Sequence, residues 1–255
     1  IVDQRKLRVI DKKNIERTIS RVNYFQLING LETLLLPNKD VKKFDTEAFD
    51  DFVAIYKFDK DFTERVFSII ADFELSLKTS VTYNFCKNNC ATLNDTMQYT
   101  NKNKYEDISK DSDYPFRSHQ YGKICDDFPK FNLFRTNYLD NLFRKNDFID
   151  DSFYRDPLYE YPSGVAVYSK DQFAAVPMWV AIQTLEFGSL KMMCHYLTKK
   201  DINDVLDDFD LLPRDREFFL SMLDIIHELR NKCAHGSLIN RFRTSNSIII
   251  NNKLN

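Results

Sequence analysis

The sequence predicts an all-α protein, and three observations lead to that fold class. Glycine and proline are scarce, with 5 Gly and 7 Pro in 255 residues, so the turn-rich pattern of β-sandwiches is missing. Apolar residues recur at helical spacing over long stretches, as in Phe62, Val66, Ile69, Ile70 and Phe73. The chain holds 22 Phe, 13 Tyr and 43% hydrophobic residues, which is enough apolar material for a packed core.

The first half of the chain begins with helices and ends in irregular structure. Helical spacing covers residues 1–36 and stops at Pro37. A helix beginning at Asp45 or Thr46 follows, and a long helix is expected from Asp59 to about Phe85. Residues 87–114 are rich in Asn, Lys, Asp and Ser, which favours a surface insertion or a flexible loop. Short helices are expected over 116–150, followed by irregular chain.

The second half returns to a helical pattern. A helix is expected from Pro177, with Trp179 in the core, and an acidic helix over 200–209. A last helix runs from near Pro213 to Gly236, a left-handed cap residue, and residues 247–251 have the composition of a short strand. We therefore expect one helical bundle over 1–255. It has N-terminal helices over 1–86, a polar, irregular insertion with short helices over 87–175, and C-terminal helices over 176–245.

Composition also bounds the cellular setting. No run of about 18 apolar residues occurs, so no membrane span is expected, and the first residues do not form a secretory signal. The five cysteines are an odd number and form no CxxC pair, which is typical of reduced thiols in a cytoplasmic protein. Cys86 and Cys90 share a helix face, but zinc needs two more ligands, so neither a metal nor another cofactor is expected.

Charge is distributed unevenly along the chain. The net charge of −2 argues against bulk attraction to nucleic acid. Residues 1–21, however, carry seven basic and three acidic side chains, whereas residues 201–217 carry seven acidic and two basic ones. A basic arm of this kind can bind RNA phosphates, although a solvated helix face accounts for the same pattern. The basic residues considered for RNA binding are Lys12, Lys13, Arg17, Arg21, Lys232, Arg241 and Arg243.

The stretch from Glu228 to Gly236 has the residues of a catalytic site. Asn231 and His235 are four residues apart and share a helix face. Arg230 lies five residues before His235, roughly 140° around the helix, and its long side chain can reach back to the same pocket. A histidine in the last helical turn suits general acid–base catalysis, because the helix dipole favours its protonated form. A neighbouring guanidinium binds a scissile phosphate and stabilises the transition state.

RNA is the substrate that this small set of groups fits. RNA supplies its own nucleophile, the 2′-OH, so a site need only move two protons and stabilise the phosphorane. One histidine does not perform both proton transfers comfortably, but two copies across a two-fold axis do, one as base and one as acid. The products would be a 2′,3′-cyclic phosphate and a 5′-hydroxyl. The Arg-x4-His spacing alone is weak, because surface pairs and a structural histidine before a glycine cap produce it too.

Several ordered segments together resemble a known family. The segment Arg230-Asn231-x-x-Ala234-His235 resembles the Arg-x4-6-His motif of the HEPN superfamily. The surroundings resemble its Abi-like (AbiD/AbiF-type) abortive-infection branch. These segments are Val22-Asn23-Tyr24-Phe25-Gln26-Leu27, Ile55-Tyr56-Lys57-Phe58-Asp59, and Pro177-Met178-Trp179 with Leu185-Glu186-Phe187-Gly188-Ser189-Leu190. One element departs from the family pattern, since Lys78 follows Glu74 where the family has Arg, and we expect an i,i+4 pair there.

The resemblance implies an HEPN-like helical bundle and a bacterial defence ribonuclease. Its implied activity is metal-independent endoribonuclease cleavage in an anti-phage abortive-infection or toxin–antitoxin system, with Arg230, Asn231 and His235 as the catalytic residues. It also implies a homodimer and an RNA partner, both as substrate and as a structured noncoding RNA. Two other classes of function stay open at this point. One is an RNA-binding module that does not cut, and the other is a structural helical adaptor.

Overall fold

The computed structural model describes residues 2–37, 40–111, 114 and 121–244. In these residues the regular elements are helices, and two isolated bridges, Arg8 with Ala48 and Arg155 with Ala174, are the β-pairing. The prediction of an all-α fold is therefore confirmed. The strand predicted over residues 247–251 lies outside the described residues. No helix in this described part of the chain has the length and apolar character that crossing a bilayer requires.

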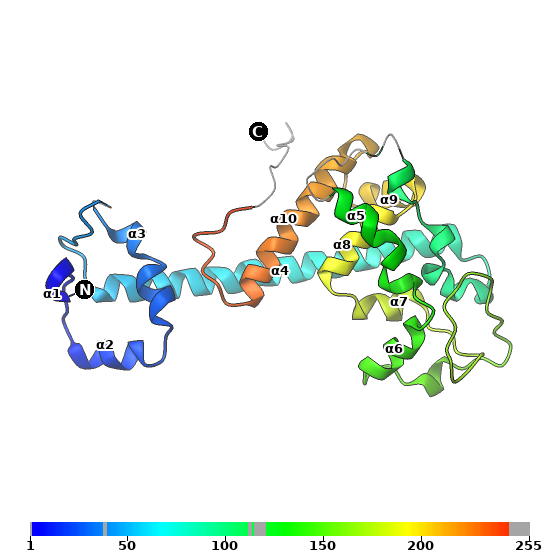
Figure 1. Ribbon diagram of the computed structural model, residues 1–255, viewed down its shortest axis with the longest axis horizontal. Coiled ribbons are helices and arrows are strands. Elements are labelled where there is room, and N and C mark those ends of the chain that lie inside the picture. Colours follow the sequence, from blue (N-terminus) through cyan, green and yellow to red (C-terminus); the bar gives the residue numbers. More distant parts are fainter. Residues whose placement is uncertain (1, 38–39, 112–113, 115–120, 245–255) are drawn as a thin grey trace. The chain divides into compact units, whose positions relative to one another are not determined.

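The chain forms two compact units, each with its own core (Figure 1). The first unit comprises Ile1–Ala71 and Glu228–Ser245, and the second is built from Asp72–His227. Two helices contribute residues to both units, namely α4 (Phe49–Asn89) and α10 (Arg216–Ala234). The segment that carries Arg230, Asn231 and His235 belongs to the first unit.

The first unit packs short helices around the N-terminal part of α4 (Figure 1). They are α1 (Val2–Arg5), α2 (Lys12–Ile19), a π-helix over Phe25–Asn29 and α3 (Glu32–Leu35). The core consists of buried apolar residues from all parts of this segment: Leu7, Leu27, Ile28, Leu31, Leu36, Phe44, Phe49 and Phe52. The near-continuous helix expected over residues 1–36 is thus wrong. Polar side chains interrupt it, because Asp11 caps the start of α2 and the Asn23 side chain accepts from the first amides of the π-helix.

The break expected before Asp59 is also missing. Helix α4 runs without interruption from Phe49 to Asn89, 41 residues, because its sequence contains neither glycine nor proline. Lys78 Nζ lies 2.9 Å from Glu74 Oε1, so the predicted i,i+4 pair forms in the second unit. Helix α4 is continuous through both residues of this pair.

The second unit surrounds the remainder of α4 with short helices (Figure 1). These are α5 (Tyr121–Asp127), α6 (Tyr138–Lys145), α7 (Met178–Ala181), α8 (Phe187–Tyr196) and α9 (Lys199–Asp208). Helices of the 3-10 type join them over Leu93–Thr100, Lys102–Lys104, Ile108–Lys110, Phe128–Lys130, Asn132–Phe134, Asp151–Tyr154, Ile182–Thr184 and Pro213–Asp215. The short helices predicted over 116–150 are found from Tyr121 onward, and the helices over 200–209 and after Pro213 are also as predicted.

Two expectations for this unit are wrong. The composition of residues 87–114 predicts a surface insertion or a flexible loop, yet Met97, Tyr99 and Ile108 are buried in the core. Short 3-10 helices bury a few apolar side chains without a long periodic pattern. The polar composition of this stretch therefore does not reveal its buried residues. Trp179 was expected in the core, but 60% of it is exposed, because its neighbours Met178 and Ala181 form the buried side of the one-turn helix α7.

Candidate functional site

Helix α10 ends in a Schellman motif that places His235 at the surface. The last helical residue is Ala234, and Gly236 adopts the left-handed conformation with φ of +63°. The amide of Gly236 donates to the carbonyl of Cys233 at 3.0 Å, and that of Ser237 donates to Lys232 at 3.1 Å. These two bonds satisfy carbonyls that the helix end leaves open. The left-handed cap predicted at Gly236 is confirmed.

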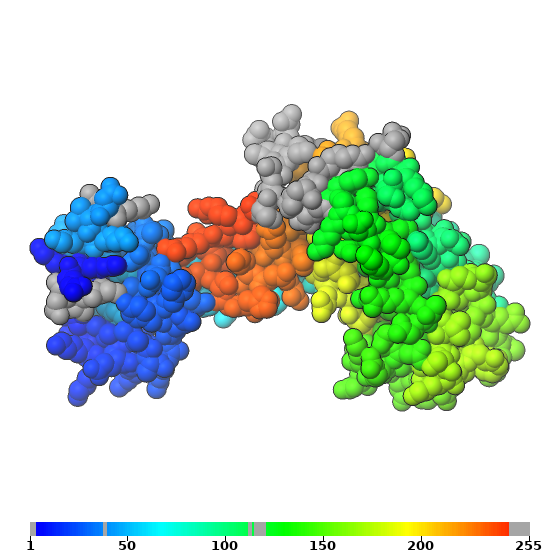
Figure 2. Space-filling model, in the orientation of Figure 1, coloured from blue at the N-terminus to red at the C-terminus, as the bar shows by residue number. Residues whose placement is uncertain are grey.

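An open pocket with a volume of about 350 Å³ lies at this helix end. Asn231 and His235 both line it, as their four-residue spacing predicts, and His235 is exposed whereas Asn231 is partly buried. Figure 2 shows the orange-to-red segment that contains them at the surface in view. The full lining is Glu228, Asn231, Lys232, His235, Ser237, Phe242 and Arg243. Cations outnumber anions in this lining, which suits a polyanionic ligand.

Arg230 does not line that pocket. The centre of its guanidinium lies 5.9 Å from the centroid of the Phe67 ring on α4, in a cation–π contact. Its Nε is buried and has no hydrogen-bond partner among the described residues. The fold thus brings Asn231 and His235 together, while Arg230 lies on another side of the helix. A guanidinium that rests on an aromatic face keeps its in-plane N–H donors for a further acceptor.

Two side chains of the first unit hold the backbone directly after His235. The ammonium of Lys60, on α4, donates to the carbonyl oxygen of Gly236. The side-chain amide of Gln26, in the π-helix, donates to the same oxygen at 3.3 Å. Segments more than 170 residues apart in the sequence therefore meet at one carbonyl. Gly236 directly follows His235, so these two bonds hold the backbone next to the imidazole.

Asp59 anchors the chain beyond the cap. Its buried carboxylate, 4% exposed, accepts hydrogen bonds from the backbone N–H of Ile239 at 3.1 Å and of Asn240 at 3.0 Å. A carboxylate that accepts two backbone N–H groups is strongly bound to its place. Sequence reasoning missed Asp59 and Lys60 as positioning residues. The signal was the segment from Tyr56 to Asp59. Its aspartate lies ten residues after the start of α4, so it does not cap that helix.

The early Asn-Tyr-Phe segment serves the same region. The side-chain oxygen of Asn23 accepts from the amides of Phe25 at 2.9 Å and Gln26 at 3.4 Å, which fixes the π-helix that presents Gln26. Gly30 ends this element in close contact with the C-terminal segment. A Cβ at Gly30 would lie 2.2 Å from the Gln26 carbonyl oxygen and 2.6 Å from Leu238. The segments around Asn23, Asp59 and His235 therefore converge at the end of α10.

The predicted RNA-binding cations differ in their surroundings. Lys12, Lys13 and Arg17 are exposed on α2, and Arg21 is exposed just after it. Within the described ranges, no ion pair engages these four side chains. Lys232 and Arg243 are exposed and line the pocket of His235. Arg241 has a structural contact instead, since it donates to the carbonyl of Asn29 at 2.8 Å and to the hydroxyl of Thr33 at 3.1 Å.

Residues of the types that bind metals are scattered across the part of the chain that the structure describes. There, no group of three or more His, Cys, Asp or Glu side chains is close enough to hold a metal ion. Cys86 and Cys90, which share a helix face, are free thiols, as are Cys125, Cys194 and Cys233.

Comparison with known proteins gives one result. A family model described as "Abi-like protein" matches residues 17–240 of this chain. Comparison with curated proteins and with solved structures finds no match. The matched range includes the early Asn23 segment, the Asp59 segment and the end of α10.

Proposed function

The chain belongs to the Abi-like protein family, and from this premise we propose that it is an endoribonuclease of an abortive-infection or toxin–antitoxin system. Arg230, Asn231 and His235 are the proposed catalytic residues. The observation that carries the proposal is the pocket at the end of α10, where exposed His235 and Asn231 face one cavity together with Lys232 and Arg243. The fold holds this helix end in place through Lys60, Gln26 and Asp59.

The proposed reaction is transesterification within RNA. A neutral imidazole removes the proton of a ribose 2′-OH, and the oxygen attacks the adjacent phosphorus. The bond from phosphorus to the 5′-oxygen breaks, and a protonated imidazole gives its proton to that oxygen. The products are a 2′,3′-cyclic phosphate and a 5′-hydroxyl, and the reaction needs no metal ion. Arg230 stabilises the phosphorane charge through in-plane N–H donors of its guanidinium, and the Asn231 amide orients the phosphate.

A second copy of the chain completes this site. One chain supplies one imidazole, at the C-terminal end of α10, whereas the reaction needs a base and an acid at the same time. Helix α4 of the first unit offers an exposed apolar stripe for the contact, consisting of Phe58, Phe62 and Ile69. Their spacing places them within about 40° on one helix face. A two-fold axis pairs such a surface with itself and brings the two motifs together.

The dimer has a quantitative test. Inactive His235→Ala protein is mixed with wild-type protein in increasing fraction, with time for subunit exchange. Because both imidazoles of a pair are needed, RNA cleavage should fall with the square of the wild-type fraction. A linear fall would show that each chain acts alone and would contradict the two-copy site.

The RNA grip is proposed to come from exposed cations. Lys12, Lys13, Arg17 and Arg21 bind phosphates of the substrate or of a structured noncoding RNA, and Lys232 and Arg243 bind close to the cut. Arg241 contributes less, because its guanidinium already binds Asn29 and Thr33. Changing the first four residues to Ala should weaken RNA binding and reduce the slope of log affinity against log salt by about four. Unchanged binding would remove the arm from the proposal.

A second function is favoured by the place of Arg230. Its guanidinium lies on Phe67 and outside the His235 pocket. This placement also fits a motif that binds RNA, or a second copy of the chain, and does not cleave RNA. In that case the protein is an RNA-binding module of a ribonucleoprotein. Cleavage assays separate the two functions. A nuclease cuts RNA and loses that activity in His235→Ala, whereas a binding module cuts RNA in neither form.

The experiment that tests the proposed nuclease uses purified full-length protein, end-labelled RNA and EDTA. Wild type should cut, and His235→Ala and Arg230→Ala should each reduce the rate by about 10²-fold or more. Arg214→Ala, which removes an exposed arginine of the second unit, serves as the matched control and should cut normally. Tight RNA binding with no cleavage by any variant would favour the binding module instead.

A further inference from the structure

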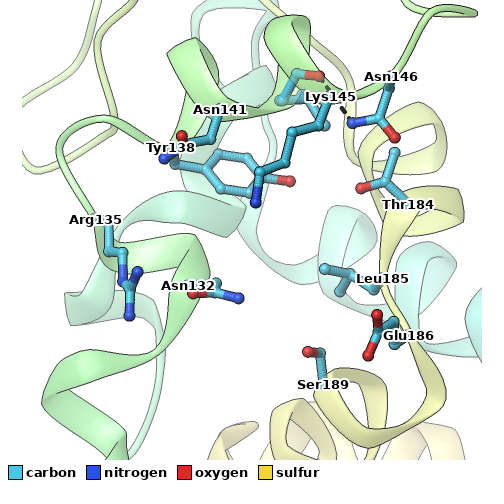
Figure 3. Close-up of a pocket in the computed structure, with 11 residues that line it drawn as sticks. Asn132, Arg135, Tyr138, Asn141, Lys145, Asn146, Thr184, Leu185, Glu186 and Ser189 are labelled. Carbon is cyan, nitrogen blue, oxygen red and sulfur yellow. Dashed lines mark hydrogen bonds between the residues drawn. The ribbon is translucent and has the colours of Figure 1, made fainter.

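A second polar pocket lies in the second unit, where α6 and the 3-10 helix before it face the start of α8 (Figure 3). Its volume of about 320 Å³ is at the lower end of the range of about 300–1,000 Å³ typical of small-molecule sites. The side chains on which the argument rests are Arg135, Tyr138, Asn141, Lys145, Glu186 and Ser189. None of them belongs to the proposed catalytic motif.

Charges of both signs face this pocket without pairing. Arg135 and Lys145 are exposed cations, and Glu186 is an exposed carboxylate. Figure 3 shows the guanidinium and the carboxylate on opposite sides of the pocket, with the Lys145 ammonium extending into the space between them. Throughout the described chain, no ion pair or side-chain hydrogen bond engages any of the three. A ligand with both an anionic group and N–H donors can bridge them, whereas a bare anion is repelled by Glu186.

Tyr138 provides an independent sign of a ligand. The residue is 7% exposed, and its buried hydroxyl makes no hydrogen bond of ordinary length among the described residues, with the hydroxyls of Thr184 and Tyr99 nearby. Figure 3 shows the ring projecting into the pocket, with its hydroxyl end toward the side where Thr184 lies. Burial raises the pKa of the Tyr138 phenol, so the group keeps its proton and is available as a donor. Buried polar groups without a hydrogen-bond partner are rare in native proteins, and a bound polar group is one explanation for such a hydroxyl.

Neutral donors and a helix end complete the lining. Asn141 on α6 and Ser189 in the first turn of α8 present an amide and a hydroxyl. Helix α8 has ten residues, and Glu186 is its N-cap residue but makes no side-chain capping bond. The positive end of the helix dipole therefore adds to the two cations on the pocket. The Glu186 carboxylate is exposed and makes no capping bond to α8.

We infer that this pocket binds one nucleoside monophosphate unit through its phosphate and its base. The phosphate contacts Lys145 and Arg135, and an exocyclic amine of the base donates to Glu186 on the opposite side. Tyr138 and Asn141 bond the ribose or the remaining base edge. A free nucleotide and a nucleotide unit within RNA share this chemistry. The inference does not depend on cleavage at His235, so the two proposals fail separately.

The binding test uses full-length protein that carries His235→Ala, so that no RNA is consumed. Calorimetry with AMP, GMP, CMP and UMP should show saturable binding, with UMP weakest because uracil has no exocyclic amine. Lys145→Ala and Arg135→Ala should each weaken binding about tenfold, and Tyr138→Phe about fivefold. Lys123→Ala, an exposed lysine of α5 outside the pocket, is the matched control and should bind normally. Glu186→Gln should abolish the preference over UMP.

Two further measurements identify the source of the ligand and the result that overturns the inference. If free nucleotides are the ligand, a single-stranded RNA tetranucleotide should not compete with them. If RNA is the source, the tetranucleotide should bind more tightly than AMP and lose that affinity in Lys145→Ala. Inorganic phosphate that binds as well as the nucleotides, no binding of any nucleotide, or equal binding by Lys145→Ala and Lys123→Ala would overturn the inference.

Discussion

The ammonium of Lys60 donates a hydrogen bond to the carbonyl oxygen of Gly236, across 176 positions of the sequence. Gly236 directly follows His235, so a residue on α4 fixes the backbone that carries the proposed catalytic imidazole. Gln26 donates to the same oxygen, and Asp59 accepts from the backbone N–H groups of Ile239 and Asn240. The position of the imidazole is thus set by contacts within the first unit and not by α10 alone.

Removal of the Lys60 contact should impair the site more than the fold. In Lys60→Ala the Gly236 carbonyl keeps only Gln26, so the turn loosens and RNA cleavage should fall about tenfold while stability falls by about 1 kcal/mol. Lys57→Ala, an exposed lysine one turn earlier on α4, is the control. Cleavage rates and denaturation curves of both variants check this. Equal rates for the two variants would show that the contact does not position His235.

Asp59 should protect the thiol of Cys233. In Asp59→Ala the amides of Ile239 and Asn240 lose their acceptor, and the free energy of unfolding should fall by about 1–3 kcal/mol. Burial, and the nearby charge of Asp59, raise the pKa of the buried Cys233 thiol. The variant should therefore react faster with iodoacetamide at Cys233, as measured by mass spectrometry. Asp61→Ala, at an exposed position on α4, should react at the wild-type rate; an equal gain there would refute the anchoring role.

Three glycines give a graded test of the packing. Gly30→Ala should be the most damaging, because the new Cβ would meet the Gln26 carbonyl at 2.2 Å and Leu238 at 2.6 Å. Gly236→Ala should cost about 1–2 kcal/mol through its positive φ alone, since its nearest neighbour, Lys60 Nζ, would lie 3.5 Å away. Gly122→Ala, with nothing within 4 Å, should be neutral or stabilising by up to about 1 kcal/mol in helix α5. Melting temperatures in any other order would contradict this account.

The second unit should lose stability in mild acid through His195. Burial, with the charges of Lys191 and Arg216, lowers the pKa of this imidazole to about 3 from its usual 6.5. Below pH 6.5 the unfolded chain takes up a proton at His195, while the folded chain does not until about pH 3. The destabilisation is therefore absent above pH 6.5 and grows as the pH falls from 6.5 to 3.

The measurement for this prediction is urea unfolding of wild type and His195→Asn between pH 7.5 and about 4. The variant removes the titrating group and should flatten the curve, whereas the contribution of carboxylates is common to both proteins. The Tyr114 hydroxyl, which hydrogen-bonds the imidazole nitrogen Nδ1, keeps a polar partner in the asparagine side chain. Parallel curves would mean that His195 is protonated or accessible in the folded protein.

Elements with a local signal were predictable from the sequence. The end of α10 at Gly236 follows from the need for a left-handed cap residue, and the Glu74–Lys78 pair follows from helix spacing. The same spacing placed Asn231 and His235 on one pocket. These features depend on residues within five positions of each other, so a linear pattern contains them.

Features that depend on distant contacts were not predictable in this way. The direction of Arg230 is decided by the ring of Phe67, and the roles of Asp59 and Lys60 by a segment about 180 residues away. Trp179 is exposed because its neighbours form the buried side of a helix of only four residues, too short for a periodic pattern to show a face. Met97 and Tyr99 lie in a stretch whose polar composition hides their burial.

The central claim, that His235 is the imidazole of a ribonuclease, is tested most directly by the chemical ends of the RNA fragments. Wild-type protein in EDTA should release fragments ending in 2′,3′-cyclic phosphate and beginning with 5′-hydroxyl, identified by mass spectrometry. The same protein with His235→Ala, folded and able to bind RNA, should release none above background. Fragments with other ends, or equal amounts from both proteins, would contradict the account.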